Sequence, residues 1–200
     1  HFEKLRRDLD MNGICVGHHK DDNVETMLIN LLRGTGLNGL TGMMPRNGWA
    51  IRPLLRVAHA DLLDYLQSIG QTYVTDSTNF TTDYTRNKIR LQLIPLLTEI
   101  NEASTKNIAK TIERLAEAEK VLAMVKAKPS DFPALAKQYS KDPASASNGG
   151  NLGFMPKDGG LGAEFENAAF SMQKGEISNV VQTAYGYHII KILNIQDNPV

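Results

Sequence analysis

Residues 13–26 read Gly13-Ile14-Cys15-Val16-Gly17-His18-His19-Lys20-Asp21-Asp22-Asn23-Val24-Glu25-Thr26. A short apolar run bounded by glycines is followed by a polar cluster and then by apolar residues at helical spacing, which are Val24, Met27, Leu28, Leu31 and Leu32. This order predicts a strand, a loop and a helix, and it favours an α/β unit. Because the lone cysteine, Cys15, lies inside the apolar run, we expect it to be a buried core residue.

The polar cluster lies where the predicted strand ends and the helix begins, which is where open α/β sheets bind ligands. Asp22 and Glu25 are three residues apart, a spacing that equally matches an N-cap and its capping-box partner. His18 and His19 are adjacent and point to opposite sides if extended, so we expect no protein-ligated metal here. A Mg²⁺ ion shared with a phosphate would need only one or two carboxylates.

A glycine-rich stretch follows this helix and reads Arg33-Gly34-Thr35-Gly36-Leu37-Asn38-Gly39-Leu40-Thr41-Gly42. Its glycines would let a ligand approach the backbone, although such stretches are more often turns, and we predict residues 34–48 as loop. Further helices are predicted at 62–69, at 89–97 with a kink at Pro95, and at 104–126. Arg86 and Arg90, four apart, could hold phosphate, while a solvated helix face is the simpler interpretation of Arg90 alone.

After Pro129 the pattern changes to shorter elements. The spacing predicts helices at 132–139 and 165–172, followed by strands at 177–183 and 187–195, which is an α+β pattern. His188 shares a strand face with Ile190 and Ile192, so a partly buried histidine with its hydrogen bonds satisfied is its simplest interpretation.

The composition is that of a folded chain. The 200 residues are 42% hydrophobic, with 22 Lys and Arg balancing 22 Asp and Glu. No apolar run approaches membrane-spanning length, so we expect no membrane association, and the single cysteine favours the reducing cytoplasm. Neither the first 120 nor the last 80 residues carry net charge, so neither part has the basic excess of an extended nucleic-acid surface.

Five stretches of the first 120 residues belong together: His19-Lys20-Asp21-Asp22-Asn23-Val24-Glu25-Thr26, Arg33 to Met43, Arg52-Pro53-Leu54-Leu55, Asp76-Ser77-Thr78-Asn79 and Arg86-Asn87-Lys88-Ile89-Arg90. In this order and spacing they resemble the tRNA(Ile)-lysidine synthetases, a family of N-type ATP-pyrophosphatases. The resemblance implies a partial adenine-nucleotide α-hydrolase-like (Rossmann-like) α/β unit that uses ATP and Mg²⁺. Its partners would be tRNA(Ile) and free lysine, whose ε-amine attacks the adenylated wobble cytidine.

The same resemblance implies an ATP and lysine site, with residues His19, Asp21, Asp22, Glu25, Arg33, Gly34, Gly36, Arg86 and Arg90.

The last part of the chain has motifs of its own: Tyr139-Ser140-Lys141-Asp142-Pro143, residues 148–154, residues 164–170, Lys174-Gly175-Glu176-Ile177-Ser178 and residues 183–190. Over residues 118–200 they resemble parvulin-type (PpiC-like) peptidyl-prolyl isomerases. The resemblance implies an α+β parvulin-like (FKBP-like superfold) domain that needs no cofactor and binds proline-containing peptide segments. Asp142, Thr183 and His188 would be catalytic. Leu152, Leu161 and Phe165 would hold the proline ring, although Leu152 and Phe165 are equally compatible with plain core.

These resemblances predict three segments: residues 1–100 as the C-terminal half of an ATP-pyrophosphatase-like domain, 101–128 as a connecting helix and 129–200 as the isomerase-like domain. The first residue is not methionine, which is compatible with a start inside a longer reading frame. The sequence contains neither the Ser-Gly-Gly-x-Asp-Ser loop of the first family nor the first strand of the second. We therefore expect two incomplete halves joined near residues 116–120, and no lysidine formation by this chain alone in an assay with tRNA(Ile), lysine and ATP. The alternatives are a chain that works only as a prolyl isomerase or chaperone, or a non-catalytic proline-peptide-binding module of a chimeric sequence.

Overall fold

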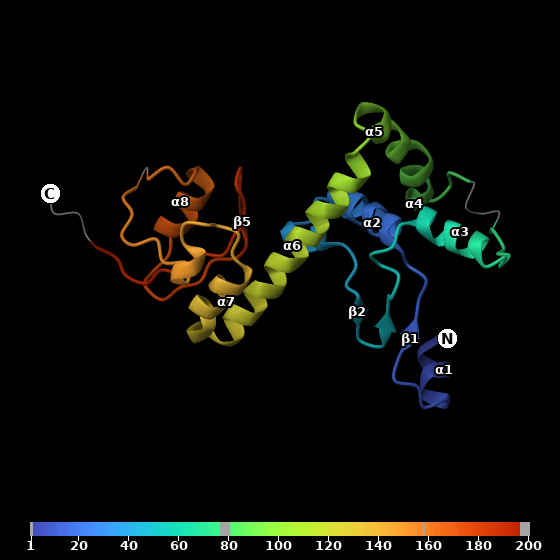
Figure 1. Ribbon diagram of the computed structural model, residues 1–200, viewed down its shortest axis with the longest axis horizontal. Helices are drawn as coiled ribbons and strands as arrows, with labels where there is room; N and C mark the ends of the chain where they lie inside the picture. The colour runs from blue at the N-terminus through green and yellow to red at the C-terminus, as the bar shows by residue number, and fades with distance from the viewer. Residues whose placement is uncertain (1, 77–80, 158, 197–200) are drawn as a thin grey trace. The chain divides into compact units, whose positions relative to one another are not determined.

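The computed structural model describes residues 2–76, 81–157 and 159–196 (Figure 1). The chain divides into two compact units, residues 1–113 (unit 1) and 114–200 (unit 2). Within the described ranges, no helix is both long and apolar enough to cross a membrane.

Unit 1 combines a small sheet with helices. Its elements are α1 (Phe2–Asp8), β1 (Ile14–Cys15), α2 (Lys20–Leu32), η1 (Leu37–Thr41), β2 (Arg46–Asn47), β3 (Ala50–Ile51), α3 (His59–Ser68), α4 (Thr85–Lys88), η3 (Ile89–Leu93), α5 (Ile94–Ile100) and the first half of α6 (Ser104–Ala127). The strand order is β1-β3-β2. β1 pairs in parallel with β3, Ile14 opposite Ala50, and β2 pairs antiparallel with β3, Arg46 opposite Ile51. The predicted α/β class of this part is confirmed.

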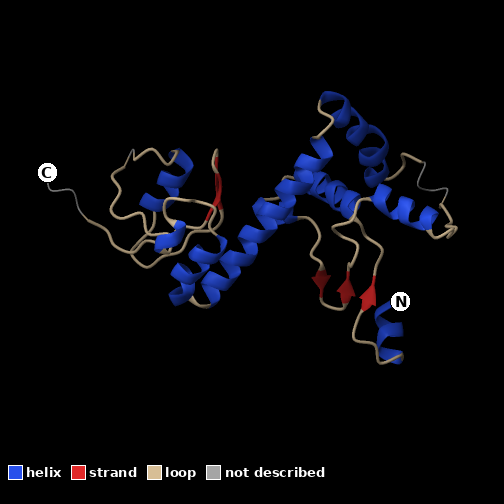
Figure 2. Ribbon diagram, in the orientation of Figure 1, coloured by secondary structure: helices blue, strands red, loops and turns tan. Residues whose placement is uncertain are grey.

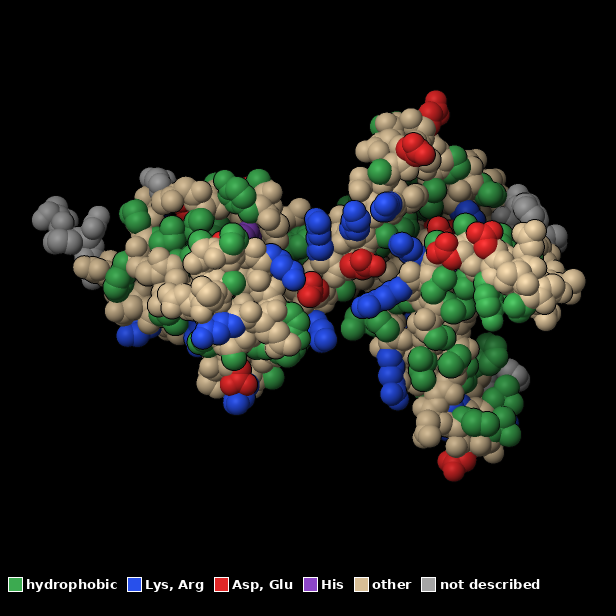
Figure 3. Space-filling model, viewed as in Figure 1, with side chains coloured by type: hydrophobic (Ala, Val, Ile, Leu, Met, Phe, Trp, Pro, Cys, Tyr) green, Lys and Arg blue, Asp and Glu red, His purple; other side chains and the backbone are tan. Residues whose placement is uncertain are grey.

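The core of unit 1 is built on the apolar side of α2. Val24, Met27 and Leu28 pack in one buried cluster with three residues that come from later elements, Ile89, Ala109 and Ile112. The helical spacing of α2 therefore predicted the burial of Val24, Met27 and Leu28 correctly, whereas Leu31 and Leu32 of the same pattern are exposed. α6 is amphipathic in the same way: its exposed side carries cations such as Lys106, Lys110 and Arg114, and Figure 3 shows Lys and Arg side chains along this helix.

Two local predictions in unit 1 are wrong. Cys15 is exposed rather than buried, and the strand that contains it is only two residues long. The predicted loop 34–48 contains the short helix η1 and the strand β2. Near Pro95, where the sequence predicts a kink, a π-helical turn, η3, directly precedes the proline, and the Ile94 N–H bonds to Ile89 O five residues back. Since proline has no N–H and crowds the carbonyl four residues earlier, the preceding turn widens.

Unit 2 contains the second half of α6 and a set of shorter elements: η4 (Pro129–Asp131), α7 (Phe132–Tyr139), η5 (Ala146–Asn148), α8 (Ala163–Phe170), β4 (Val181–Thr183) and β5 (Gly186–His188) (Figure 2). β4 and β5 form an antiparallel hairpin with Val181 opposite His188. An isolated bridge between Ile177 and Lys191 continues the pairing, so the two predicted strands exist but are regular over a shorter length. The α+β pattern of this part is confirmed.

Candidate functional site

The polar cluster of unit 1 forms around the first turn of α2. The backbone N–H of His19, directly before the helix, donates a hydrogen bond of 3.0 Å to Asp22 Oδ2. Asp22 therefore caps the helix from its third position, and the interpretation of Asp22 as N-cap with Glu25 as its partner is wrong. The reason is that α2 begins at Lys20, so His19 is the N-cap and Asp22 is the third residue of the helix, while the Lys20 N–H bonds to Val57 O.

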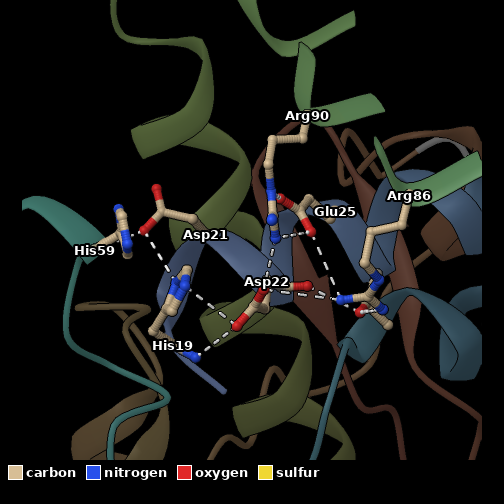
Figure 4. A network of polar contacts seen from close by, with 8 residues as sticks. His19, Asp21, Asp22, Glu25, His59, Arg86 and Arg90 are labelled. Atoms are coloured by element: carbon tan, nitrogen blue, oxygen red, sulfur yellow. Dashed lines mark hydrogen bonds and ion pairs between the residues drawn. The ribbon is translucent and has the colours of Figure 1, made fainter. Parts of the chain in front are cut away.

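Glu25 is buried and is held by Arg90 (Figure 4). Arg90 Nε donates to Glu25 Oε1 at 2.6 Å and Arg90 Nη2 donates to Glu25 Oε2 at 3.0 Å, which is a bidentate pair. Arg90 Nη2 also donates to Asp22 Oδ1 at 3.0 Å. The hydrogen bond to Glu25 raises the pKa of Arg90 above its ordinary value. Interpreting Arg90 as part of a solvated helix face is therefore wrong.

Arg86 lies against the same carboxylates. Its Nη1 is 3.6 Å from Glu25 Oε2 and 3.9 Å from Asp22 Oδ1, and its Nη2 donates to Thr26 Oγ1 at 3.0 Å. Two carboxylates thus face two guanidinium groups, so the charges of this inner part balance.

The outer part of the cluster consists of two histidines and Asp21. The His19 ring lies between two carboxylates, with Nε2 3.3 Å from Asp22 Oδ2 and Nδ1 3.4 Å from Asp21 Oδ2. The His59 N–H donates to Asp21 Oδ2 at 2.8 Å, and the rings of His19 and His59 are 5.0 Å apart. The sequence reasoning missed His59. It follows β3, and because β1 and β3 are parallel, residues after these strands meet at one edge of the sheet.

Asp21 is the carboxylate of this cluster that is most available to bind a cation. Its side chain is 48% exposed, whereas Asp22 and Glu25 face arginines. The part of the chain that the structure describes contains no group of three or more His, Cys, Asp or Glu that could hold a metal ion. The donor set therefore fits Mg²⁺ only if phosphate oxygens of a bound nucleotide complete the coordination around Asp21.

The glycine-rich stretch lies at the other end of α2. Arg33 directly follows the helix and is exposed, eleven residues after Asp22, which corresponds to about 16 Å along the helix axis. Gly34 and Gly36 continue beyond Arg33 in exposed loop. The structure thus brings His19, Asp21, Asp22, Glu25, Arg86 and Arg90 together, but not Arg33, Gly34 or Gly36. Of the Asp76 motif, residues 77–79 lie outside the described residues.

A second polar group forms in unit 2 across the β4–β5 hairpin. Thr183 Oγ1 and His188 Nε2 share a hydrogen bond of 2.8 Å. The Phe165 ring meets the His188 ring edge to face, with centroids 5.5 Å apart and an interplanar angle of 88°. Burial lowers the pKa of His188 below its ordinary value, and the Asp142 charge acts in the opposite direction. His188 is therefore partly buried and hydrogen-bonded, as its strand position predicts.

Asp142 organises a turn beside this group. Its carboxylate accepts hydrogen bonds from the N–H of Ala144 and of Ser145, both at 3.2 Å, and from the Ser145 hydroxyl. The Ser145 hydroxyl is the largest cause that lowers the pKa of Asp142. Ser145 is buried and was missed by the sequence reasoning, although its spacing of three from Asp142 is typical of such side-chain turns.

The two remaining predicted pocket residues lie on the loop between η5 and α8. Leu152 is 44% exposed, so its interpretation as plain core is wrong, and Leu161 is half-buried. Of the six predicted residues in unit 2, the structure brings Thr183 and Phe165 into contact with His188, and the charge of Asp142 raises the pKa of His188 against the effect of burial. The other two lie outside the contacts described above.

Comparisons with known proteins match both parts of the chain. Residues 1–97 match the PP-loop domain family, and residues 78–196 match the PPIC-type PPIase domain family. The tRNA(Ile)-lysidine synthase of Bacteroides thetaiotaomicron is 52% identical over 114 residues, which are 57% of this chain and 27% of the relative. That of Parabacteroides distasonis is 49% identical over 120 residues, 60% of this chain and 27% of the relative. The chain thus spans about a quarter of the length of these curated relatives.

Two solved structures are similar to parts of the chain. The peptidylprolyl isomerase PrsA from Bacillus anthracis is 27% identical with a TM-score of 0.39, over 70% of this chain and 66% of PrsA. The U34-tRNA thiolase NcsA from Methanococcus maripaludis is 18% identical with a TM-score of 0.43, over 57% of this chain and 39% of NcsA. Both TM-scores are low, so the assignment rests on the sequence matches.

These matches confirm the two resemblances and the order of the two folds, an adenine-nucleotide α-hydrolase-like region followed by a parvulin-like domain. The alternative of a prolyl isomerase alone does not account for residues 1–97. The chain belongs to the PPIC-type PPIase domain family through residues 78–196, and it joins this domain to a PP-loop region similar to tRNA(Ile)-lysidine synthases.

Proposed function

We propose that unit 2 is a peptidyl-prolyl cis/trans isomerase. The observation that carries this proposal is the contact group of Thr183, His188 and Phe165, an apolar ring beside a hydrogen-bonded histidine. Asp142, Thr183 and His188 would act at the amide. Leu152, Leu161 and Phe165 would receive the proline ring.

This group has the chemistry that prolyl isomerisation requires. The barrier of about 18–20 kcal/mol arises from the partial double bond of the peptide, and it falls where an apolar pocket favours the twisted amide. No cofactor is needed. The lowered pKa of His188 keeps its ring neutral at neutral pH, while the lowered pKa of Asp142 keeps a negative charge beside it. That charge would disfavour the charge-separated resonance form of the planar amide.

The test is the rate of cis/trans exchange of a short proline peptide with the full chain as catalyst. Because Asp142 also holds a turn, the informative variant is Asp142→Asn, which keeps a hydrogen-bond acceptor and removes the charge. We expect it to lose about tenfold or more of kcat/KM, whereas Asp131→Asn should match the wild type, because the Asp131 side chain is 43% exposed and its carboxylate pairs only locally with Lys128. Equal rates for the two variants would contradict the proposal.

A second function concerns unit 1. We propose that residues 1–100 act as part of an ATP-pyrophosphatase-like domain that serves lysidine formation, with ATP, Mg²⁺, free lysine and tRNA(Ile) as substrates and cofactors. The proposed arrangement places residues 101–128 as the connecting helix and 129–200 as the isomerase domain. Its support is the identity of 52% with a tRNA(Ile)-lysidine synthase and the cluster around Asp21, Asp22 and Glu25. His19, Arg86, Arg90, Arg33, Gly34 and Gly36 complete the proposed ATP and lysine site.

Within this proposal, Asp21 is the residue that would hold Mg²⁺ together with nucleotide phosphates, and the ion would neutralise phosphate charge there. Equilibrium dialysis of ATP with the full chain in the presence of Mg²⁺ tests it. We expect Asp21→Asn to weaken ATP binding severalfold, whereas Asp64→Asn, at an exposed site on α3, should not. Unchanged binding in Asp21→Asn would contradict this role.

We also propose that the chain works in the reducing cytoplasm. The support is its single cysteine, which is exposed and free.

A further inference from the structure

The sequence contains four Asn-Gly pairs, Asn12-Gly13, Asn38-Gly39, Asn47-Gly48 and Asn148-Gly149. Asparagine followed by glycine is prone to lose its side-chain amide spontaneously, because glycine has no side chain to shield its backbone nitrogen. That nitrogen can attack the carboxamide carbon of the asparagine. No residue of the four pairs has a role in either proposed function, and the structure places the pairs in different surroundings.

In Asn47-Gly48 the glycine nitrogen is available. Asn47 ends β2, Gly48 begins the two-residue turn to β3, and both residues are exposed (Figure 2). The Gly48 N–H has no hydrogen-bond partner among residues 2–76, 81–157 and 159–196. A Cβ placed on Gly48 would meet no atom within 4 Å, so the space beside this peptide group is open. Neither a hydrogen bond nor packing therefore holds the Gly48 nitrogen away from the asparagine.

In two of the other pairs the glycine nitrogen is held by a hydrogen bond. The Gly39 N–H donates to Gly36 O at 2.9 Å, and the Gly149 N–H donates to Ala146 O at 3.2 Å. The attack requires that the amide lose its proton and turn towards the carboxamide carbon, so each of these hydrogen bonds must break first. The hydrogen bonds therefore slow the reaction in both pairs.

The remaining glycine, Gly13, is half-buried and closely packed. Its N–H also has no partner in the described part of the chain, but a Cβ on Gly13 would lie 2.9 Å from both Trp49 O and Ile51 Cδ1. Because β3 crowds this peptide group, the group has little room to move towards the Asn12 side chain. We therefore expect Asn12 to react more slowly than Asn47.

Arg46 brings a positive charge to the reactive segment. Arg46 Nε donates to Gly48 O at 3.2 Å, so the guanidinium lies against the glycine whose nitrogen attacks. No carboxylate of the described ranges forms an ion pair with Arg46, so its charge is not neutralised there. The attack passes through a deprotonated amide and a negatively charged tetrahedral carbon, and a nearby cation stabilises both. Arg46 therefore favours the reaction at Asn47.

We propose that Asn47 is a site of spontaneous deamidation. The Gly48 nitrogen loses its proton to hydroxide and forms a bond to Asn47 Cγ, and the side-chain nitrogen takes up a proton and leaves as ammonia, which gives a five-membered succinimide. Water then adds to one of the two succinimide carbonyl carbons, and the bond from that carbon to the ring nitrogen breaks. One direction of opening gives aspartate and the other gives isoaspartate. The net reaction consumes one water and releases one ammonia.

Both products alter the β2–β3 hairpin. Aspartate adds a negative charge next to Arg46. Isoaspartate adds one methylene group to the backbone at the residue that pairs with Ala50, so the two-residue strand β2 cannot keep its register with β3. Trp49, the only tryptophan, lies in the turn and reports this change by its fluorescence. The proposal depends on neither proposed function, because the reaction needs only water.

Peptide mapping by mass spectrometry tests the proposal on the full chain, incubated for several days at mildly alkaline pH. Trypsin places the four asparagines in separate peptides, and deamidation raises the mass of each peptide by the replacement of NH₂ with OH. The chain unfolded in guanidinium chloride is the reference, and each folded rate is divided by the unfolded rate at the same asparagine. We expect this ratio to be largest at Asn47 and at least about threefold smaller at Asn38 and Asn148.

Two variants test the separate steps. Arg46→Gln should slow deamidation at Asn47 about threefold and leave Asn148 unchanged, whereas Lys110→Gln, at an exposed position of α6, should change neither rate. Asn47→Ser cannot form the succinimide. Its Trp49 fluorescence should therefore stay constant over an incubation in which that of the wild type changes.

The opposite results would overturn the proposal. A ratio at Asn38 or Asn148 equal to that at Asn47 would show that the hydrogen bonds of the glycines do not control the reaction. An unchanged rate in Arg46→Gln would show that the guanidinium takes no part. Equal fluorescence changes in the wild type and in Asn47→Ser would contradict the effect on the hairpin.

Discussion

Arg90 closes over Glu25 with two hydrogen bonds, one of 2.6 Å from Nε to Oε1 and one of 3.0 Å from Nη2 to Oε2. The Glu25 side chain is 1% exposed, whereas that of Arg90 is 34% exposed. The pair joins α2 to the π-helical turn η3, and the residues directly before them in sequence, Val24 and Ile89, meet in the core of unit 1. Site and core are therefore coupled through two adjacent positions on each element.

Removing Arg90 should destabilise unit 1. A buried charge that loses its partner costs about 3–5 kcal/mol, and because Arg86 remains 3.6 Å from Glu25 we expect about 3 kcal/mol for Arg90→Met. The measurement is urea unfolding followed by the fluorescence of Trp49, the only tryptophan, which lies in unit 1. The control is Lys88→Met, at an exposed position of the same segment.

Two outcomes decide that prediction. The double variant Glu25→Gln/Arg90→Met should recover part of the lost stability, because no buried charge then remains uncompensated. If Arg90→Met and Lys88→Met lose the same stability, the pair is not a buried ion pair in solution.

These contacts also show what the sequence could predict. The apolar spacing of α2 identified Val24, Met27 and Leu28 correctly, because one residue in three or four of an amphipathic helix faces the core. It did not predict that Leu31 and Leu32, in the last turn of the same helix, are exposed. The exposure of Cys15 was not predicted, because it depends on which other elements cover the strand. Arg90 was misplaced because its partner lies 65 residues earlier in the sequence, and no local pattern records such a contact.

Gly42 should not tolerate a side chain. Its φ is +68°, and a Cβ there would collide with Asn23 Oδ1, which accepts the Met43 N–H at 2.6 Å. Strained backbone and the lost hydrogen bond together cost about 2–3 kcal/mol, so we expect Gly42→Ala to lower the unfolding free energy of unit 1 by this amount. Gly36→Ala is the matched control, because Gly36 has a φ of −67° and open space around it. Equal urea midpoints for the two variants, read by Trp49 fluorescence, would contradict this account.

Ser145 should set the pH at which the kcat/KM of the isomerase falls on the acid side. Its hydroxyl is the main cause of the lowered pKa of Asp142, so Ser145→Ala should raise that pKa towards the ordinary aspartate value of about 3.9. The pH at which kcat/KM falls on the acid side should therefore move upward. Ser171→Ala, at an exposed serine of unit 2, should leave the profile unchanged. A loss of rate with no displacement of the acid limb would mean that Ser145 only supports the turn.

His188 should make the stability of unit 2 depend on pH. Because burial lowers its pKa in the folded state below the ordinary value of about 6.5, the unfolded chain binds a proton more readily than the folded one. The stability is therefore fully present above about pH 6.5, declines as the pH falls towards the folded pKa, and levels off below it. Asp142 also has a lowered pKa, so its contribution is lost only at more acid pH, below the ordinary aspartate value of about 3.9. The two pH windows do not overlap above pH 4, so the decline in stability just below neutral pH comes from the histidine.

Urea titrations followed at the Tyr187 amide resonance measure this dependence of stability on pH. The wild type should show it, as should His59→Gln, whose histidine lies in unit 1, and His188→Gln should lose it. If the slope persists in His188→Gln, the lowered pKa of His188 does not control the folding of this hairpin.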